Sequence, residues 1–171
     1  MDANAIPDEI RASIFEVDYP GLSKMGFEAV YYDLDNTLLR RDEDNVSHEV
    51  YSLVKSLRYK FYVNIISNTI IQSKVARARE IGRILGVDAI CCDFSRRKPK
   101  AWGYRQAQRL TGVEFSLSVM VGDQFFTDLI GAKRLGMYTI YVPPLGPDIW
   151  FSIFTFRRWR EARILRRLAN R

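Results

Sequence analysis

Five short apolar runs, separated by segments with helical patterns, constrain the fold of this chain more than any other feature. The runs are rich in β-branched and aromatic residues and cover positions 29–32, 61–66, 89–92, 118–121 and 138–142. None alternates cleanly between apolar and polar positions, as expected for strands buried on both faces. The helical patterns lie at residues 46–59, 71–85, 101–110 and 127–135. This order predicts an α/β fold, a Rossmann-like three-layer α/β/α sandwich with a mainly parallel sheet.

The length of 171 residues suits one domain with a substantial core. We expect this domain to span residues 1–147, in which 1–26 form an N-terminal extension with a leading helix and a turn at 19–21. No window approaches the roughly 20 apolar residues of a membrane-spanning helix. The first residues also lack the pattern of a secretory signal. The adjacent Cys91 and Cys92 are predicted to be buried apolar residues, and a cytoplasmic protein is expected.

The basic character of the chain belongs to its last residues. The whole chain has a net charge of +6, and residues 157–171 alone contain seven arginines and one glutamate. We expect residues 148–171 to form a basic amphipathic tail that follows an aromatic run at 149–156. Such a helix suits an anionic membrane surface, so peripheral binding to the inner face of a membrane is predicted. Packing on the domain and binding of nucleic acid are the alternatives.

Two carboxylates, Asp33 and Asp35, directly follow the apolar run at 29–32. Residues i and i+2 of an extended chain point to the same side, and open α/β sheets bind ligands at the carboxyl ends of their strands. Two carboxylates placed there repel each other unless a cation joins them, and Mg²⁺ takes oxygen ligands. Metal-assisted phosphoryl transfer is therefore predicted. The alternative is that the segment ending at Thr37 only makes a turn or caps a helix.

Polar residues follow three further predicted strands. Ser67 and Asn68 come after the run at 61–66, where they would bind a phosphoryl oxygen or cap the next helix. Lys98 comes after the run at 89–92, and a lysine is a common point charge for phosphate. The spacing does not distinguish Lys98 from the other basic residues of this segment, which are Arg96, Arg97 and Lys100.

The fourth polar segment contains Asp123 and Asp128, after the run at 118–121. Gly122 permits close approach at the strand end, so Asp123 is a candidate ligand for Mg²⁺. Asp128 falls at the start of the next helix, where it would either anchor the lysine or favour the helix dipole.

The order DxDxT, Ser-Asn-Thr, Lys-Pro and GDxxxTD, each at a strand end, resembles the haloacid dehalogenase superfamily of phosphatases over roughly residues 22–145. The segments 32–38, 121–128 and 131–140 are similar to its bacterial YqeG-type branch, subfamily IIIA, which includes phosphatidylglycerophosphate phosphatases of mitochondria and plastids. The resemblance implies that Asp33 is the nucleophile that forms an aspartyl-phosphate. It implies that Asp35 protonates the leaving group and then activates water, while Thr37 supports the loop.

The same resemblance implies roles for the remaining motif residues. Ser67 and Asn68 would bind the phosphoryl group. Lys98 would neutralise charge between the nucleophile and the phosphate. Asp123 would hold Mg²⁺ together with Asp33 and the backbone carbonyl of Asp35. Asp128 would order the lysine or a metal-bound water.

Many members of this superfamily have a cap domain inserted after the first or second motif. Here about 29 residues lie between Thr37 and Ser67 and about 30 between Ser67 and Lys98, so a capless enzyme is expected. An open site favours a large substrate. The leading hypothesis is hydrolysis of phosphatidylglycerophosphate to phosphatidylglycerol at a membrane surface. A phosphatase acting on a nucleotide or polynucleotide end is one alternative, and a non-catalytic membrane- or nucleic-acid-binding module is the other.

Overall fold

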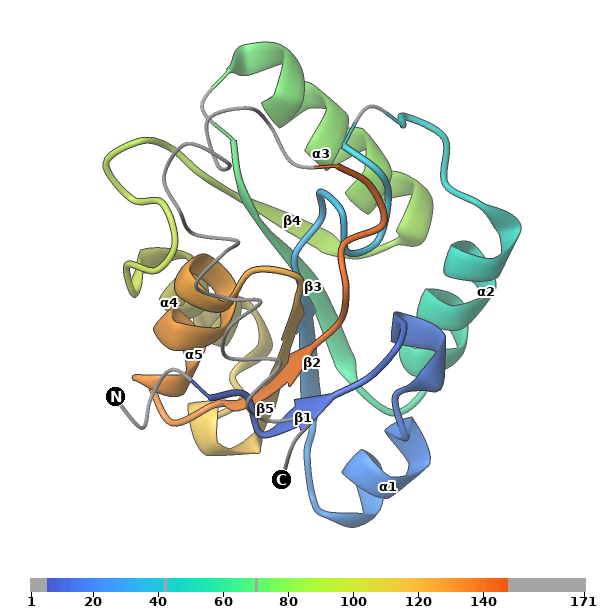
Figure 1. Ribbon diagram of the computed structural model, residues 1–171, viewed down its shortest axis with the longest axis vertical. Helices are drawn as coiled ribbons and strands as arrows, with labels where there is room; N and C mark the ends of the chain where they lie inside the picture. The colour runs from blue at the N-terminus through green and yellow to red at the C-terminus, as the bar shows by residue number, and fades with distance from the viewer. Residues whose placement is uncertain (1–5, 42, 70, 148–171) are drawn as a thin grey trace.

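Six parallel strands form one sheet in the order β1-β6-β5-β2-β3-β4, which confirms the predicted α/β fold. They are seen in a computed structural model that describes residues 6–41, 43–69 and 71–147 (Figure 1). The strands are β1 (Glu9–Ile10), β2 (Ala29–Tyr32), β3 (Tyr62–Asn68), β4 (Asp88–Cys92), β5 (Ser118–Gly122) and β6 (Tyr138–Tyr141). The predicted tail at 148–171 lies outside the described residues.

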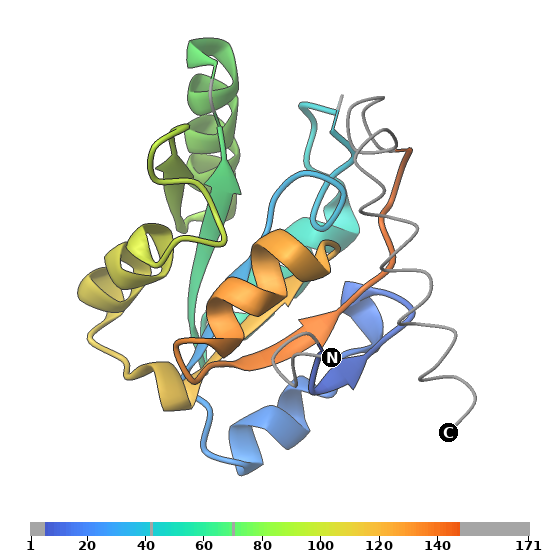
Figure 2. The same cartoon turned by 60° about the vertical axis from the view of Figure 1, so that its left-hand side comes forward.

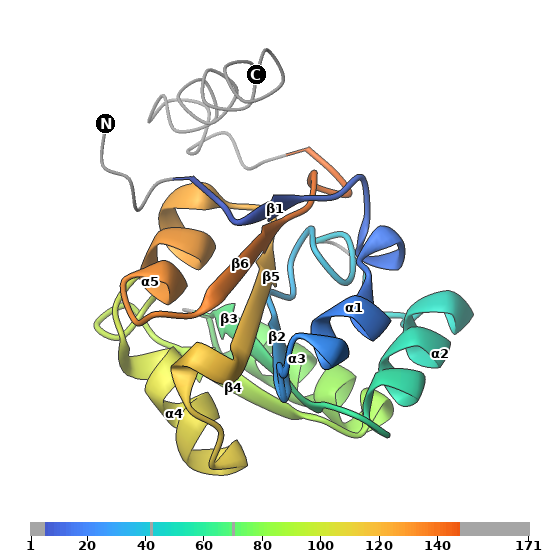
Figure 3. The same cartoon turned by 90° about the horizontal axis from the view of Figure 1, so that it is seen from below.

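Helices cover both faces of the sheet, as the three-layer prediction requires. The helices are α1 (Tyr19–Lys24), α2 (His48–Leu57), α3 (Gln72–Leu85), α4 (Trp102–Thr111) and α5 (Ile130–Lys133). Three single turns, η2 (Ile14–Glu16), η3 (Phe115–Leu117) and the π-helical η4 (Phe125–Leu129), complete the described elements. One face is covered by α1, α2 and α3, and the other by α4, η4 and α5 (Figure 3).

The central strand β2 explains why the apolar runs do not alternate with polar residues. Val30 and Tyr32 belong to the core under α1–α3, whereas Ala29 and Tyr31 belong to the core under α4 and α5. All four side chains are fully buried. Each tyrosine hydroxyl has a partner, Tyr32 with the hydroxyl of Tyr19 at 2.5 Å and Tyr31 with Thr111 Oγ1 at 3.0 Å. A strand buried on both faces therefore tolerates two tyrosines because their polar ends are satisfied.

Helix boundaries follow the local signals in the sequence. The Ser47 hydroxyl accepts a hydrogen bond from the backbone N–H of Val50 and so caps α2. Both α3 and α4 end at a glycine in the left-handed conformation, Gly86 (φ 67°) and Gly112 (φ 73°).

The N-terminal extension differs from the prediction of a leading helix. Residues 9 and 10 form β1, which pairs with β6 in parallel. Asp8 fixes this strand, since its Oδ2 accepts hydrogen bonds from the N–H (2.9 Å) and hydroxyl (2.7 Å) of Thr139. Lys133 Nζ adds contacts to Asp8 Oδ1 at 2.9 Å and to the carbonyl of Ile6 at 2.6 Å. The predicted turn at 19–21 is instead the first turn of α1, capped by Asp18 through the N–H of Gly21.

Strand β2 is the point where the chain changes direction across the sheet. The chain runs from β2 to β3 and β4 on one side, and then crosses to β5 and β6 on the other side (Figures 1 and 2). In open α/β sheets the ligand site lies at such a switch point, beyond the carboxyl ends of the strands. Within the described residues the connections after β2 and β3 contain only α2 and α3, and no cap domain is inserted there. Nor does any described helix combine the length and apolarity needed to cross a bilayer.

Candidate active site

The four polar segments meet at the carboxyl edge of the central strands. Tyr32 of β2 lies opposite Ile65 of β3 and Val121 of β5, so Asp33 follows at the level where β5 ends and two residues before the end of β3. The N–H of Asp33 extends the ladder by donating to the carbonyl of Val121 at 3.0 Å. Ser67 and Asn68 are the last two residues of β3 rather than a separate loop. Their predicted alternative role as a helix cap is wrong, because Ile71 occupies the N-cap position of α3 and this helix has no side-chain cap hydrogen bond.

The loop after Asp33 folds back on itself through Asn36. Asn36 adopts the left-handed conformation (φ 68°), which asparagine tolerates better than most residues. Its N–H donates to the carbonyl of Leu39 at 2.7 Å, and the N–H groups of Leu38 and Leu39 donate to the carbonyl of Leu34. This tight turn brings the hydroxyl of Thr37 to 3.5 Å from Asp123 Oδ1. The first and fourth polar segments are thereby joined.

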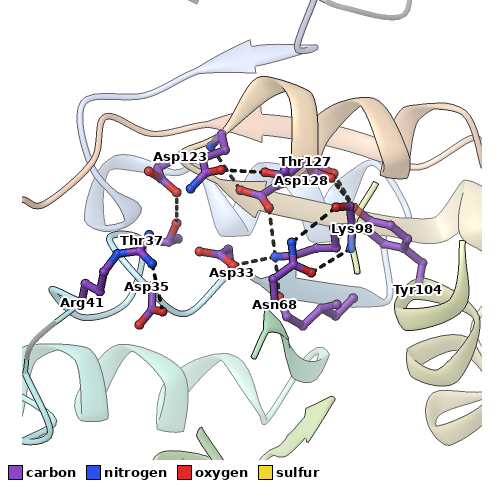
Figure 4. A network of polar contacts seen from close by, with 12 residues as sticks. Asp33, Asp35, Thr37, Arg41, Asn68, Lys98, Tyr104, Asp123, Thr127 and Asp128 are labelled. Atoms are coloured by element: carbon purple, nitrogen blue, oxygen red, sulfur yellow. Dashed lines mark hydrogen bonds and ion pairs between the residues drawn. The ribbon is translucent and has the colours of Figure 1, made fainter. Parts of the chain in front are cut away.

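Lys98 is the basic residue of its loop that reaches the site. Its side chain is 1% exposed, whereas Arg96, Arg97 and Lys100 are exposed. The ammonium lies 2.5 Å from Asp33 Oδ1, 2.9 Å from Asp128 Oδ1 and 2.6 Å from the carbonyl of Ile66 (Figure 4). Since an ammonium has three N–H donors, these three acceptors account for all of them.

Asn68 fixes the backbone of Lys98, and Tyr104 fixes the backbone of the segment that contains Asp128. The Asn68 amide pairs with the backbone of Lys98, accepting from its N–H at 2.7 Å and donating to its carbonyl at 3.4 Å. The buried Tyr104 hydroxyl of α4 lies 3.0 Å from the carbonyl of Thr127 and 2.8 Å from that of Asp128. Sequence reasoning missed Tyr104, which resembles any other apolar position of an amphipathic helix.

Asp128 occupies space that a side chain at position 122 would otherwise fill. A Cβ atom placed on Gly122 would lie 2.7 Å from both Cβ and Oδ2 of Asp128. Asp128 Oδ2 also accepts a hydrogen bond from the N–H of Gln124 at 3.1 Å. The close approach predicted for Gly122 thus serves Asp128, which lies in η4 at the start of the helical segment.

Three buried carboxylates form a cluster that fits a divalent cation. Asp33, Asp123 and Asp128 each offer an oxygen within 4.8 Å of the others. With Lys98 as the neighbouring cation, three carboxylates and one ammonium leave two negative charges. Carboxylate oxygens are the ligands preferred by Mg²⁺, and a divalent ion would balance this charge. The carboxylate of Asp35 is not part of the cluster, and the expectation that its backbone carbonyl is a metal ligand stays a prediction.

Burial and the excess of negative charge shift the pKa values in this cluster. Burial raises the pKa of Asp33 to about 7, and the nearby Asp128 and Asp35 add to the shift while Lys98 opposes it. Burial alone would lower the pKa of Lys98, but the carboxylates of Asp128 and Asp33 hold that pKa well above its ordinary value. Lys98 therefore stays charged at neutral pH, whereas Asp33 titrates there.

Asp35 is held by an arginine that the sequence did not single out. Arg77 of α3 places Nη1 2.7 Å from Asp35 Oδ1, and Arg41 Nη1 lies 3.9 Å from Asp35 Oδ2. Figure 4 shows the Asp35 carboxylate pointing toward Arg41 and away from Lys98. Arg77 also donates to the carbonyl groups of Arg40 and Glu43 and pairs with Asp44. One guanidinium thus joins Asp35, the loop that follows it and α3.

Comparison with known proteins identifies the family. A family model described as haloacid dehalogenase-like hydrolase matches residues 3–136. A curated relative, "Probable phosphatase YqeG" of Bacillus subtilis (strain 168), is 29% identical over 167 residues, covering 97% of this chain and 92% of the relative. This similarity confirms the resemblance to the YqeG-type branch.

Solved structures share the fold at low sequence identity. The haloacid dehalogenase phosphatase of Thermococcus onnurineus aligns with a TM-score of 0.58 and 17% identity, covering 72% of this chain and 90% of that one. A haloacid dehalogenase family enzyme of Bacteroides thetaiotaomicron, solved as a magnesium complex, aligns with a TM-score of 0.50 and 15% identity, covering 75% and 98%. Since the family model spans most of the chain and the motif residues meet in one buried cluster, the chain belongs to the haloacid dehalogenase-like hydrolases and is a phosphatase.

Proposed function

We propose that the enzyme hydrolyses phosphate monoesters through a covalent aspartyl-phosphate on Asp33. The observation that supports this role is the position of Asp33, which lies at the switch point of the sheet and against the ammonium of Lys98. A carboxylate oxygen of Asp33 attacks phosphorus, and the bond from phosphorus to the leaving-group oxygen breaks. Lys98 offsets the negative charge that nucleophile and phosphoryl group share. Ser67 at the end of β3 is the proposed phosphate-binding hydroxyl.

Mg²⁺ is the proposed cofactor, held by Asp33 and Asp123 with the backbone carbonyl of Asp35. When bound, it neutralises charge on the transferred phosphoryl group. The structural relative from Bacteroides thetaiotaomicron was solved with magnesium, which supports this choice. Asp128 keeps Lys98 in place through their 2.9 Å ion pair.

Asp35 is the proposed proton donor and acceptor. It gives a proton to the leaving-group oxygen, and as a carboxylate it then takes a proton from the water that attacks the aspartyl-phosphate. The second step releases inorganic phosphate and regenerates Asp33. Because the carboxylate of Asp35 is bound to Arg77 at 2.7 Å, these proton transfers require it to exchange this partner for the reacting oxygen.

The proposed substrate is phosphatidylglycerophosphate, presented by a membrane. Two features support a substrate of this size. The described residues contain no cap domain over the site. The YqeG-type resemblance also extends to a branch that includes phosphatases of this lipid.

Phosphate release from phosphatidylglycerophosphate in detergent micelles tests the proposal. The wild-type enzyme with Mg²⁺ is expected to release phosphate, and Asp33→Asn is expected to release none. Ser95→Ala, on the exposed loop before Lys98, is a control that keeps the active-site cluster intact. Release that survives Asp33→Asn would exclude the covalent mechanism. Turnover of a 5′-phosphorylated oligonucleotide, with no turnover of the lipid, would favour the polynucleotide alternative.

A further inference from the structure

The loop that carries Lys98 into the site also presents an aromatic and basic surface to solvent. This loop, residues 93–101, connects β4 to α4 (Figure 1, yellow-green). Lys98 points inward, whereas Arg96, Arg97 and Lys100 are exposed. Phe94 is 63% exposed, although phenylalanine side chains are ordinarily buried. We call this set of side chains the rim surface: the exposed Phe94, Arg96, Arg97 and Lys100, and the adjoining, partly buried Trp102.

The rim surface is an ordered arrangement in which cations lie against aromatic rings. The guanidinium of Arg97 lies 4.5 Å from the ring centre of Phe94, and that of Arg96 lies 5.0 Å from the ring of Trp102. Lys100 Nζ donates to the carbonyl of Ser95 at 2.6 Å. Such pairing orients both the aromatic and the charged groups before any partner arrives.

The rim surface is also fixed relative to the catalytic cluster. Asn68 holds the backbone of Lys98, and the Lys98 ammonium is bound by Asp33 and Asp128. Arg97 directly precedes Lys98 in the chain. A partner that binds the rim surface is therefore bound to the same loop that places Lys98 against Asp33.

The charges of this surface call for an anionic partner. Lys98 is neutralised by its buried carboxylates, and Asp93 lies 3.8 Å from Arg96. Within the described part of the chain, neither Arg97 nor Lys100 has a carboxylate at ion-pair distance. Cations beside an exposed aromatic ring match a bilayer interface, where lipid phosphates lie next to the first acyl carbons.

We propose that the rim surface docks the enzyme onto a bilayer of anionic phospholipid. Phe94 enters the interfacial layer, and Arg97 and Lys100 contact lipid phosphate groups. The proposal rests on the proposed function, because a lipid substrate must reach Asp33 from the membrane. Docking at the rim surface presents one lipid headgroup to the open site, while the neighbouring lipid headgroups bind the loop at residues 93–101.

An exposed pair at the amino ends of the strands, away from the carboxyl ends that form the site, supplies a matched control. Tyr59 and Lys60 precede β3 at the amino ends of the strands, and Tyr59 is 83% exposed. This pair also offers one aromatic ring and one cation. Nonspecific adsorption of such groups to vesicles would therefore act at this pair as well. Docking through this pair would turn Asp33 away from the membrane.

Co-sedimentation of the full chain with vesicles tests the proposal. Vesicles of phosphatidylcholine mixed with phosphatidylglycerol are compared with vesicles of phosphatidylcholine alone, at low and high salt. The double variant Phe94→Ala/Arg97→Ala is expected to bind the anionic vesicles about tenfold or more weakly than wild type, since one interfacial cation alone contributes about fivefold. Tyr59→Ala/Lys60→Ala is expected to bind within about twofold of wild type. Both variants should hydrolyse a small chromogenic phosphate at the wild-type rate, which verifies their folding.

The outcomes separate this inference from the proposed function. Equal vesicle binding by the two double variants and the wild type would overturn the docking surface, even if Asp33-dependent lipid turnover is found. A loss of vesicle binding on Phe94→Ala/Arg97→Ala, without lipid turnover by the wild type, would support the docking surface and reject the lipid as substrate. If Phe94→Ala/Arg97→Ala bound vesicles as wild type does and lost binding only to a single-stranded oligonucleotide, the partner of the rim surface would be a nucleic acid and not a bilayer.

Discussion

Replacing Lys98 by methionine should show how much of the stability depends on the buried ion cluster. Methionine keeps an unbranched side chain of similar length but removes the ammonium and its contacts to Asp33, Asp128 and the carbonyl of Ile66. Removing one partner of a buried ion pair costs about 3–5 kcal/mol, because the other partner stays buried and charged. The whole domain is expected to have a free energy of unfolding of only about 5–15 kcal/mol. Lys98→Met should therefore remove a large part of it.

The loss should depend on pH in a defined direction. Lys98 lowers the pKa of Asp33 against the raising effect of burial, so its removal should raise the pKa of Asp33 beyond its present value of about 7. At pH 5.5 Asp33 is then protonated and needs no cation, whereas at pH 8 more of the uncompensated charge remains. The difference in unfolding free energy between wild type and Lys98→Met should accordingly be larger at pH 8 than at pH 5.5.

Urea denaturation at the two pH values, without metal, measures both quantities. Lys100→Met is the matched control, because Lys100 belongs to the same loop but is exposed. Its effect should stay within about 0.5 kcal/mol. The reasoning is refuted if Lys98→Met is no more destabilising than Lys100→Met at pH 8. Saturating Mg²⁺, which is expected to add about 2.7 kcal/mol at 100 times its dissociation constant, should restore part of the loss.

Three further predictions concern the same cluster and its surroundings. Because burial raises the pKa of Asp33 to about 7, protons compete with Mg²⁺ for this carboxylate below that pH. Calorimetric titration should show that the affinity for Mg²⁺ rises about tenfold per pH unit up to pH 7 and is constant above it. Gly122→Ala should lower kcat at least about tenfold in a phosphate-release assay, because the new Cβ displaces Asp128. Arg77→Met should lower the unfolding free energy by about 2 kcal/mol and reduce kcat, since it releases the proposed proton donor and the loop after it. The exposed Arg79→Met on the same helix should change neither, and an equal effect of both variants would count against the role of Arg77.

Residues that directly follow strands could be predicted from the sequence. Asp33, Ser67 and Asp123 each come at or after the end of an apolar run, and parallel strands bring their carboxyl ends to one edge. Helix ends marked by Ser47 and Gly86 were also predictable, since a capping hydroxyl and a left-handed glycine act over a few residues.

Features that depend on distant contacts could not be predicted. Strand β1 has only two residues and no period of its own, and it is defined by pairing with β6 far along the chain. Arg77 lies 42 positions from Asp35 on a helix with other arginines, so no local signal marks it. The inward direction of Lys98, among three basic neighbours, likewise follows from tertiary contacts with Asp33 and Asp128.

The short strand β1 has a further consequence for how copies of this protein meet. A sheet ends in a row of unpaired backbone N–H and C=O groups, which can recruit a strand from another molecule and start aggregation. Strand β1 covers the β6 side of the sheet, and Asp8 with Lys133 holds it there. The outermost position is thus given to a strand of two residues, too short to template a long pairing with another chain. A short β1 at this edge should therefore limit association between the sheets of two copies.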